Sequence, residues 1–104
     1  MQVQLHTDKS LEPGDGLAQQ VEATVRTALR RWAERVTRVE VHLNDLNSHK
    51  GGAADKRCLM EARLGGLQPV AVSNRAGTVE EAVAGAADKL TRSLESTLGR
   101  LSDR

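Results

Sequence analysis

The spacing of apolar residues changes along the chain between a period of two and a period close to 3.6, which predicts a series of strands and helices. Val3 and Leu5 alternate with polar neighbours and indicate a short strand at the start. A helix is expected from about Leu17 to Ala33, with Asp15 as a candidate N-terminal cap. Its apolar stripe recurs every three or four positions and consists of Leu17, Val21, Val25, Ala28, Leu29 and Trp32.

The period of two returns twice in the middle of the chain, over residues 37–45 and 56–64. These two strands are separated by a polar, glycine-containing loop over 46–55. Gly65 and Gly66 suit a tight hairpin turn into a further strand over 69–73. The side chains expected on the inner face of the two long strands are Val39, Val41, Leu43, Cys58, Met60, Ala62 and Leu64.

Helical periodicity dominates the last quarter of the chain. Residues 74–77 form a predicted turn, and Thr78 with Glu81 three residues later makes a capping box. The helix is expected to run from Thr78 to about Leu101, slightly weakened by Gly85 and Gly99. Its apolar side comprises Val79, Val83, Ala86, Leu90, Leu94, Thr97 and Leu101.

The predicted order is therefore βαβββα, an α+β fold of two layers formed by residues 1–104 as one domain. The three middle strands have short connections and should form an antiparallel meander, with the first strand added beside one of them. Both helices need an apolar surface to cover, and the inner face of the four-stranded sheet supplies it. The other sheet face should then be solvated, which suits its Arg, Glu, His and Asn residues.

Composition narrows the classes of function. Trp32 is the only aromatic residue among Phe, Trp and Tyr, so the stacking platforms of many single-strand RNA modules are missing. With 15 basic and 14 acidic residues, the formal net charge is +1, and any attraction to nucleic acid has to come from local clustering. The single cysteine fits a reducing, cytoplasmic location, and neither a signal peptide nor a membrane span is expected.

Basic residues cluster in and just after the first helix. Between Arg26 and Arg38 there are five positive charges and one negative charge, Glu34. Exposed arginines spaced a helical turn apart are suited to phosphate contacts. An ordinary solvated helix face, with late arginines complementing the helix dipole, explains the same pattern. The five residues are Arg26, Arg30, Arg31, Arg35 and Arg38, and a smaller basic stripe on the last helix contains Lys89 and Arg92.

No catalytic, cofactor or metal site emerges from the sequence. His6 and His42 occupy outward strand positions and could lie near each other, but Cys58 points to the opposite face. A closed set of metal ligands therefore cannot be assembled, and Cys58 is interpreted as a small core residue. Without a nucleophile, paired carboxylates or a phosphate-binding loop, the chain is not expected to be an enzyme or to bind a small-molecule substrate.

Three stretches of the chain match the pattern of a known family. They are Val39-Glu40-Val41-His42-Leu43, the helix end Leu29-Arg30-Arg31-Trp32, and the last-helix string Asp88-Lys89-Leu90-Thr91-Arg92-Ser93-Leu94. With the order βαβββα, they make the chain resemble the ribosome hibernation-promoting factors, which include ribosome-associated inhibitor A and were also called sigma-54 modulation proteins. The resemblance extends over essentially the whole chain.

This resemblance implies a fold similar to double-stranded RNA-binding domains. It also implies docking on small-subunit ribosomal RNA, in the channel for messenger and transfer RNA, through basic side chains of the two helices. Such docking would idle ribosomes during stress. The RNA-binding residues carried over in this way are Arg26, Arg30, Arg31, Lys89 and Arg92.

An alternative function belongs to a different class. The near-neutral charge and the acidic residues near the end of the last helix fit a protein–protein regulatory module that kept the fold and lost RNA affinity. Ribosome co-sedimentation at low salt distinguishes the two hypotheses.

Overall fold

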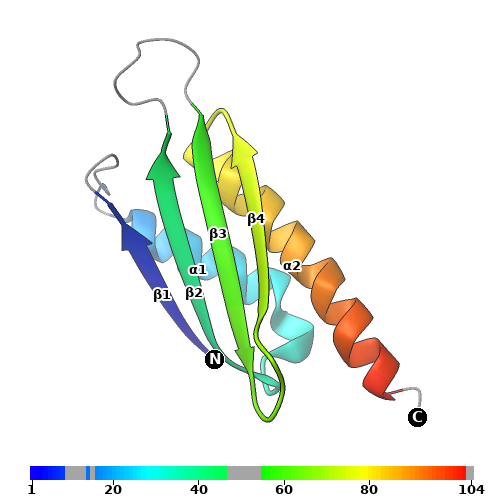
Figure 1. The fold of residues 1–104 in the computed structure, drawn as a ribbon. Helices are drawn as coiled ribbons and strands as arrows, with labels where there is room; N and C mark the ends of the chain where they lie inside the picture. Colours follow the sequence, from blue (N-terminus) through cyan, green and yellow to red (C-terminus); the bar gives the residue numbers. More distant parts are fainter. Residues whose placement is uncertain (9–13, 15, 47–54, 103–104) are drawn as a thin grey trace.

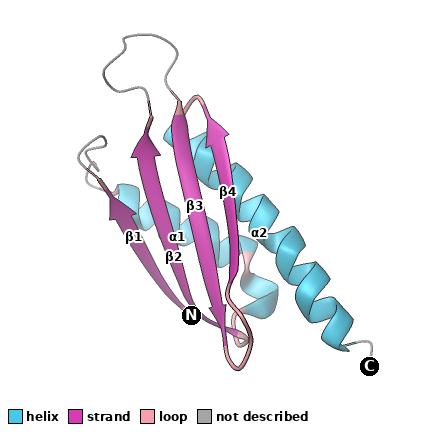
Figure 2. Ribbon diagram, viewed as in Figure 1, coloured by secondary structure: helices cyan, strands magenta, loops and turns pink. Residues whose placement is uncertain are grey.

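The protein folds into a four-stranded sheet with two helices on one of its faces (Figures 1 and 2). The computed structural model describes residues 1–8, 14, 16–46 and 55–102, and of residues 100–102 it describes the backbone alone. The elements in chain order are β1 (Gln2–Thr7), α1 (Leu17–Ala28), a short 3-10 helix η1 (Arg30–Trp32), β2 (Val36–Asp45), β3 (Lys56–Leu64), β4 (Val70–Ala76) and α2 (Val79–Ser102).

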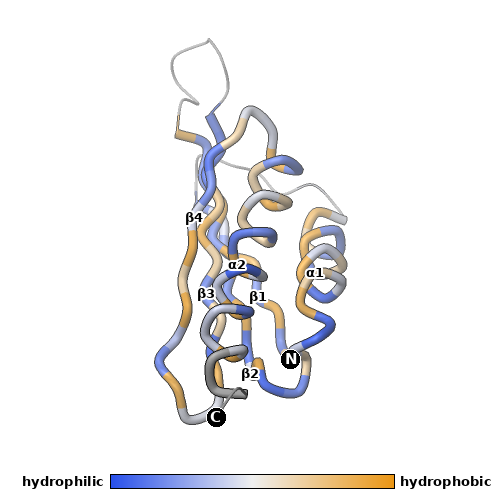
Figure 3. The backbone as a smooth tube through the Cα atoms, turned by 90° about the vertical axis from the view of Figure 1, so that its right-hand side faces the viewer, coloured by the Kyte–Doolittle hydropathy of each residue, from blue (hydrophilic) through white to orange (hydrophobic). Residues whose placement is uncertain are grey.

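The strands lie in the sheet in the order of the sequence, β1-β2-β3-β4. β1 pairs with β2 in parallel, because α1 carries the chain back across the sheet between them. β2, β3 and β4 form the predicted antiparallel meander. Seen from the side, the sheet and the two helices make two separate layers (Figure 3). The predicted two-layer α+β fold is confirmed.

The core lies between these layers and follows the predicted alternation. Val39, Val41, Leu43, Cys58, Met60 and Ala62 of the two central strands are fully buried. Val21, Val25 and Leu29 reach them from the first helical segment, and Ala86, Leu90 and Leu94 from α2. Cys58 is thus a core residue, as expected. No helix in the described part of the chain is long and apolar enough to cross a membrane.

The first helix ends earlier than the periodicity predicts, at Ala28 instead of Ala33. After Leu29, hydrogen bonds between residues three apart take over: the Trp32 amide donates to the Leu29 carbonyl, and Arg35 donates to Trp32, both over 2.9 Å. This tighter winding turns the chain back toward the sheet, so that Leu29, Trp32 and Val36 all enter the core.

The last strand is longer than predicted, because residues 74–76 continue β4 instead of forming a turn. They pair with residues 56–58 of β3, and this pairing satisfies backbone groups that a turn would leave open. Asn74 points toward α2, where its amide donates to the carbonyls of Glu81 and Ala82 over 3.4 and 3.3 Å. A Cβ on Gly85 would lie 2.1 Å from that amide nitrogen. Gly85 therefore permits a close contact between strand and helix.

The predicted turn and cap signals have different outcomes. Gly66 adopts φ 76° in the β3–β4 hairpin, a left-handed conformation that favours glycine. The Thr78 hydroxyl accepts a hydrogen bond from the Glu81 amide over 3.1 Å, which confirms the cap of α2. Gly16 occupies the N-cap position of α1. The predicted cap Asp15 and most of the predicted 46–55 loop lie outside the described residues.

Candidate nucleic-acid interface

The segment after α1 holds two of the predicted RNA-binding residues, Arg30 and Arg31. Trp32, next in the sequence, is buried and anchors the segment in the core. The Arg31 guanidinium lies 5.2 Å from the Trp32 ring centre, a cation–π contact, and its side chain remains 77% exposed. The anchoring of Trp32 thus holds the backbone of both arginines at a defined place on the helix layer while their charged groups face solvent.

Arg31 also links η1 to α2. Its guanidinium lies 3.7 Å from the carboxylate of Glu95 on α2. Arg92 precedes Glu95 by three residues, about one helical turn, and is paired with Asp88 over 2.7 Å. The structure therefore brings Arg31 and Arg92 to the same region of the helix layer, with two exposed carboxylates near them.

The other two predicted residues, Arg26 and Lys89, have partners on other flanks of the helices. Ala23, Thr24, Thr27 and Ala28 of α1 line a groove shared with α2. Arg26 is not part of this lining and is paired with Glu22 over 2.8 Å. Lys89 lies on the flank of α2 that faces β4, where its ammonium donates to the Ser73 carbonyl over 2.9 Å. The five predicted residues therefore do not form one compact patch.

Two arginines of the predicted cluster have no ion pair within the described residues. Both Arg30 and Arg35 are exposed. Together with Arg31 and Arg92 they form what we call the arginine end of the helix layer. The ion pairs of Arg31 and Arg92 are exposed to solvent, and such pairs contribute only about 0–1 kcal/mol. A phosphate can replace these carboxylates at small cost, so the guanidinium groups remain usable for binding.

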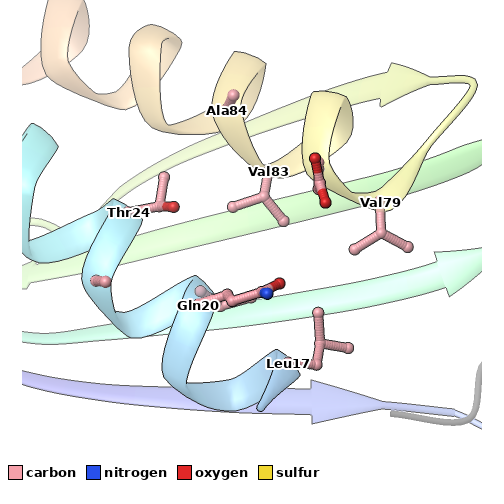
Figure 4. Close-up of a pocket in the computed structure, with 9 residues that line it drawn as sticks. Leu17, Gln20, Thr24, Val79, Val83 and Ala84 are labelled. Carbon is pink, nitrogen blue, oxygen red and sulfur yellow. The ribbon is translucent and has the colours of Figure 1, made fainter. Parts of the chain in front are cut away.

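The groove between the two helices has a different character. Toward the start of each helix it is lined mainly by apolar and small neutral side chains, and Leu17, Thr24, Val79 and Val83 face one another there (Figure 4). Among the described residues that line it there, Glu80 is the one that carries a charge. Positive charge on the helix layer is therefore concentrated near the end of α1 and not along this groove.

The open face of the sheet carries Arg38 of the predicted basic cluster together with Arg63 and Arg75, which the sequence did not assign to a cluster. Alternation along the strands was the available signal, because it places these side chains outward. Arg38 and Arg63 both contact Glu40, over 3.4 and 3.6 Å, and Arg75 contacts Asp55 over 2.7 Å. Most of this charge is balanced within the face, so the arginine end remains the better candidate for phosphate binding.

The histidines and the cysteine are placed differently from each other. His6, Glu40 and His42 come together on the open face, where the sequence alone did not assemble a set of ligands. Cys58 lies on the buried face, and burial raises the pKa of its thiol to about 12. The thiol therefore stays protonated at neutral pH and takes no part in that group.

Comparisons with known proteins agree with the fold. The sequence model of the family described as sigma 54 modulation protein / S30EA ribosomal protein matches residues 5–102. The N-terminal domain of protein Y from Thermus thermophilus superimposes with a TM-score of 0.75 at 19% identity, covering 93% of this chain and 99% of that one. A ribosomal subunit interface protein from Coxiella burnetii gives a TM-score of 0.71 at 12% identity, covering 95% and 99%. No curated protein matches the sequence significantly.

Proposed function

The chain belongs to the sigma 54 modulation protein / S30EA ribosomal protein family, and from this membership we propose that it associates with the ribosome and inhibits translation. The match over residues 5–102 is the observation that carries the proposal. One structural neighbour is a ribosomal subunit interface protein, which points to the same kind of partner. A cytoplasmic location and a binding role without catalysis follow from this function.

The proposed contact is between the helix layer and small-subunit ribosomal RNA in the channel used by messenger and transfer RNA. The arginine end forms its centre, because Arg30 and Arg35 have no ion pair among the described residues and Arg31 and Arg92 have weak ones. Guanidinium groups can donate two parallel hydrogen bonds to one phosphate. Arg26 and Lys89 flank this centre and make outer contacts when their present partners are exchanged.

Recognition of this kind reads the position of phosphates and not the bases. The arginine end offers charge-assisted donors but, within the described residues, no aromatic side chain exposed for base stacking, since Trp32 is buried. Occupation of the channel would exclude messenger and transfer RNA sterically, which makes the protein an inhibitor without any chemical step.

Sedimentation of ribosomes with a triple variant tests this proposal. Arg30→Gln, Arg31→Gln and Arg92→Gln together lower the formal net charge from +1 to −2, since each substitution removes one positive charge. The variant should remain folded and leave the ribosome fractions of a low-salt sucrose gradient. Losing three charge-assisted hydrogen bonds of about 1.5 kcal/mol or more each would weaken binding by at least about a thousandfold.

A matched control carries the same change of charge on the other face. Arg57→Gln, Arg63→Gln and Arg75→Gln on the open sheet also give a net charge of −2 and should leave ribosome binding nearly intact. Equal loss in both variants would mean that overall charge, and not the arginine end, controls binding. If the unaltered protein fails to co-sediment even at low salt, ribosome docking is wrong, and the protein–protein regulatory module becomes the better hypothesis.

A further inference from the structure

A cluster of side chains that could bind a metal ion lies on the open sheet face, on the opposite side from the helices. The parallel register of β1 and β2 places His6 directly beside His42, and Gln4 beside Glu40. The two imidazole rings are stacked with their centres 4.7 Å apart and their planes 16° from parallel. Glu40 is two residues before His42, so strand alternation puts all three side chains on one face.

The donor atoms of these side chains have a spacing close to that of a metal site. One ligand atom from each of His6, Glu40 and His42 lies within 4.8 Å of the others, and His6 Nε2 is 3.3 Å from Glu40 Oε1. Tetrahedral zinc with bonds of about 2.0–2.1 Å separates its ligand atoms by about 3.3–3.4 Å. The His6–Glu40 distance already matches, and rotation of the exposed His6 side chain can bring its ring toward the other two ligands.

The surroundings of Glu40 leave one carboxylate oxygen for a ligand. Arg38 and Arg63 contact Oε2 over 3.4 and 3.6 Å, whereas His6 contacts Oε1. In metal sites, neighbouring groups that contact a ligating carboxylate keep that carboxylate oriented toward the ion. The Glu40 side chain is 19% exposed and that of His6 is 45% exposed. A bound ion would therefore be half-sheltered by the strands and open to water on its outer side.

We infer that His6, Glu40 and His42 form a binding site for a divalent first-row transition ion of the zinc class, with water completing the coordination. Two imidazoles and one carboxylate favour Zn²⁺, Ni²⁺ or Cu²⁺ over Mg²⁺ and Ca²⁺, which prefer all-oxygen sites. The nearby arginines reduce the affinity, because their positive charge repels the ion. The site lies on the open face of the sheet, opposite the helices that carry the arginine end.

Binding at this site would stabilise the edge of the sheet. β1 has one neighbouring strand, and His6 belongs to β1 whereas Glu40 and His42 belong to β2. An ion held by all three residues links the two strands across their parallel ladder. A ligand that binds only the folded state raises the thermal midpoint, so the stabilisation by zinc should grow with the logarithm of the ratio of free zinc to Kd.

Isothermal titration of the untagged protein with ZnCl₂ tests the inference. We expect one zinc ion per chain, no comparable heat with MgCl₂, and a rise in the thermal midpoint with zinc. His6→Gln and His42→Gln should each weaken zinc binding at least about tenfold and remove the thermal shift. Far-UV circular dichroism of each variant verifies that the sheet is retained.

The third histidine of the chain supplies a matched control. His49→Gln removes the same chemical group and should leave both stoichiometry and affinity within about twofold of the unaltered protein. Loss of binding in this variant, or unchanged binding in His6→Gln and His42→Gln, would overturn the site. The absence of zinc binding at millimolar concentration would overturn it as well. NMR gives a readout that does not depend on stability, because zinc addition should shift the imidazole resonances of His6 and His42.

Discussion

The role of each basic side chain depends on what surrounds its donor groups. Lys89 donates to the Ser73 carbonyl of β4, whereas Arg30 has no ion pair within the described residues. Arg31 is intermediate, because it contacts Trp32 and Glu95 but stays largely exposed. The contacts around a basic side chain, and not its chemical type, thus decide whether it serves the fold or remains available to bind a phosphate.

Cys58 shows the same dependence for a titratable group. Its burial raises the pKa of the thiol from 9.0 to about 12, because the thiolate would lose its hydration in the core. At a pH between these two pKa values, the thiol is ionised in the unfolded chain and protonated in the folded protein. The contribution of this group to stability is therefore complete below about pH 9 and decreases as the pH rises toward 12.

We therefore expect the free energy of unfolding to fall with rising alkaline pH in a way that depends on Cys58. Between pH 8 and pH 10 this residue alone should account for a loss of about 1 kcal/mol. Urea unfolding of the unaltered protein and of Cys58→Ala at both pH values measures it, because groups other than Cys58 contribute equally to both proteins. An identical pH dependence in the two proteins would contradict the shifted pKa.

At the scale of elements, β4 and α2 are joined by a contact that needs a small residue. Asn74 donates to two carbonyls of α2 and occupies the space where a side chain at position 85 would begin. Glycine usually weakens a helix interior by about 1 kcal/mol relative to alanine. At position 85 this intrinsic cost is accepted in exchange for close packing of the strand on the helix.

A double-mutant cycle tests this interpretation. Gly85→Ala alone should give no net gain in the free energy of unfolding, because displacement of Asn74 offsets the better helix propensity. In an Asn74→Ala background the same substitution should stabilise the protein by about 1 kcal/mol, which gives a coupling energy of about 1 kcal/mol or more. Denaturant unfolding of the four proteins provides the comparison.

Gly99 offers the control for this cycle, since nothing lies within 4 Å of a Cβ added there. Gly99→Ala should be neutral or stabilise by up to about 1 kcal/mol, whether or not Asn74 is present. Additive effects of Gly85→Ala and Asn74→Ala would show that the two residues do not compete for space.

At the scale of the whole molecule, a net charge of +1 conceals an uneven distribution. The open sheet balances most of its arginines with carboxylates, and the groove between the helices is nearly neutral. Four arginines remain at one end of the helix layer, namely Arg30, Arg31, Arg35 and Arg92. Association with RNA should therefore be driven by this end, and little by long-range attraction.

The salt dependence of ribosome binding follows from that distribution. Four phosphate contacts predict a slope of about −3 in a plot of log K against log salt, and hence about a 60-fold loss of affinity between 50 and 200 mM salt. Arg30→Gln should reduce the slope by about one unit. Binding measured by filtration or fluorescence at four salt concentrations determines the slope, and strong binding with a flat slope would refute phosphate docking.

The sequence by itself determined the order of the elements and the side of each element that is buried, because hydrophobic periodicity depends on local geometry. It also predicted the α2 cap and the core position of Cys58, and its motifs pointed to the family. The early end of α1 and the extension of β4 depended on how Trp32 and Asn74 meet distant residues. Strand register and helix packing alone decided that His6 lies beside His42, that Arg31 reaches Glu95, and that Lys89 donates to the Ser73 carbonyl. Such pairings join residues remote in the sequence, and no local pattern encodes them.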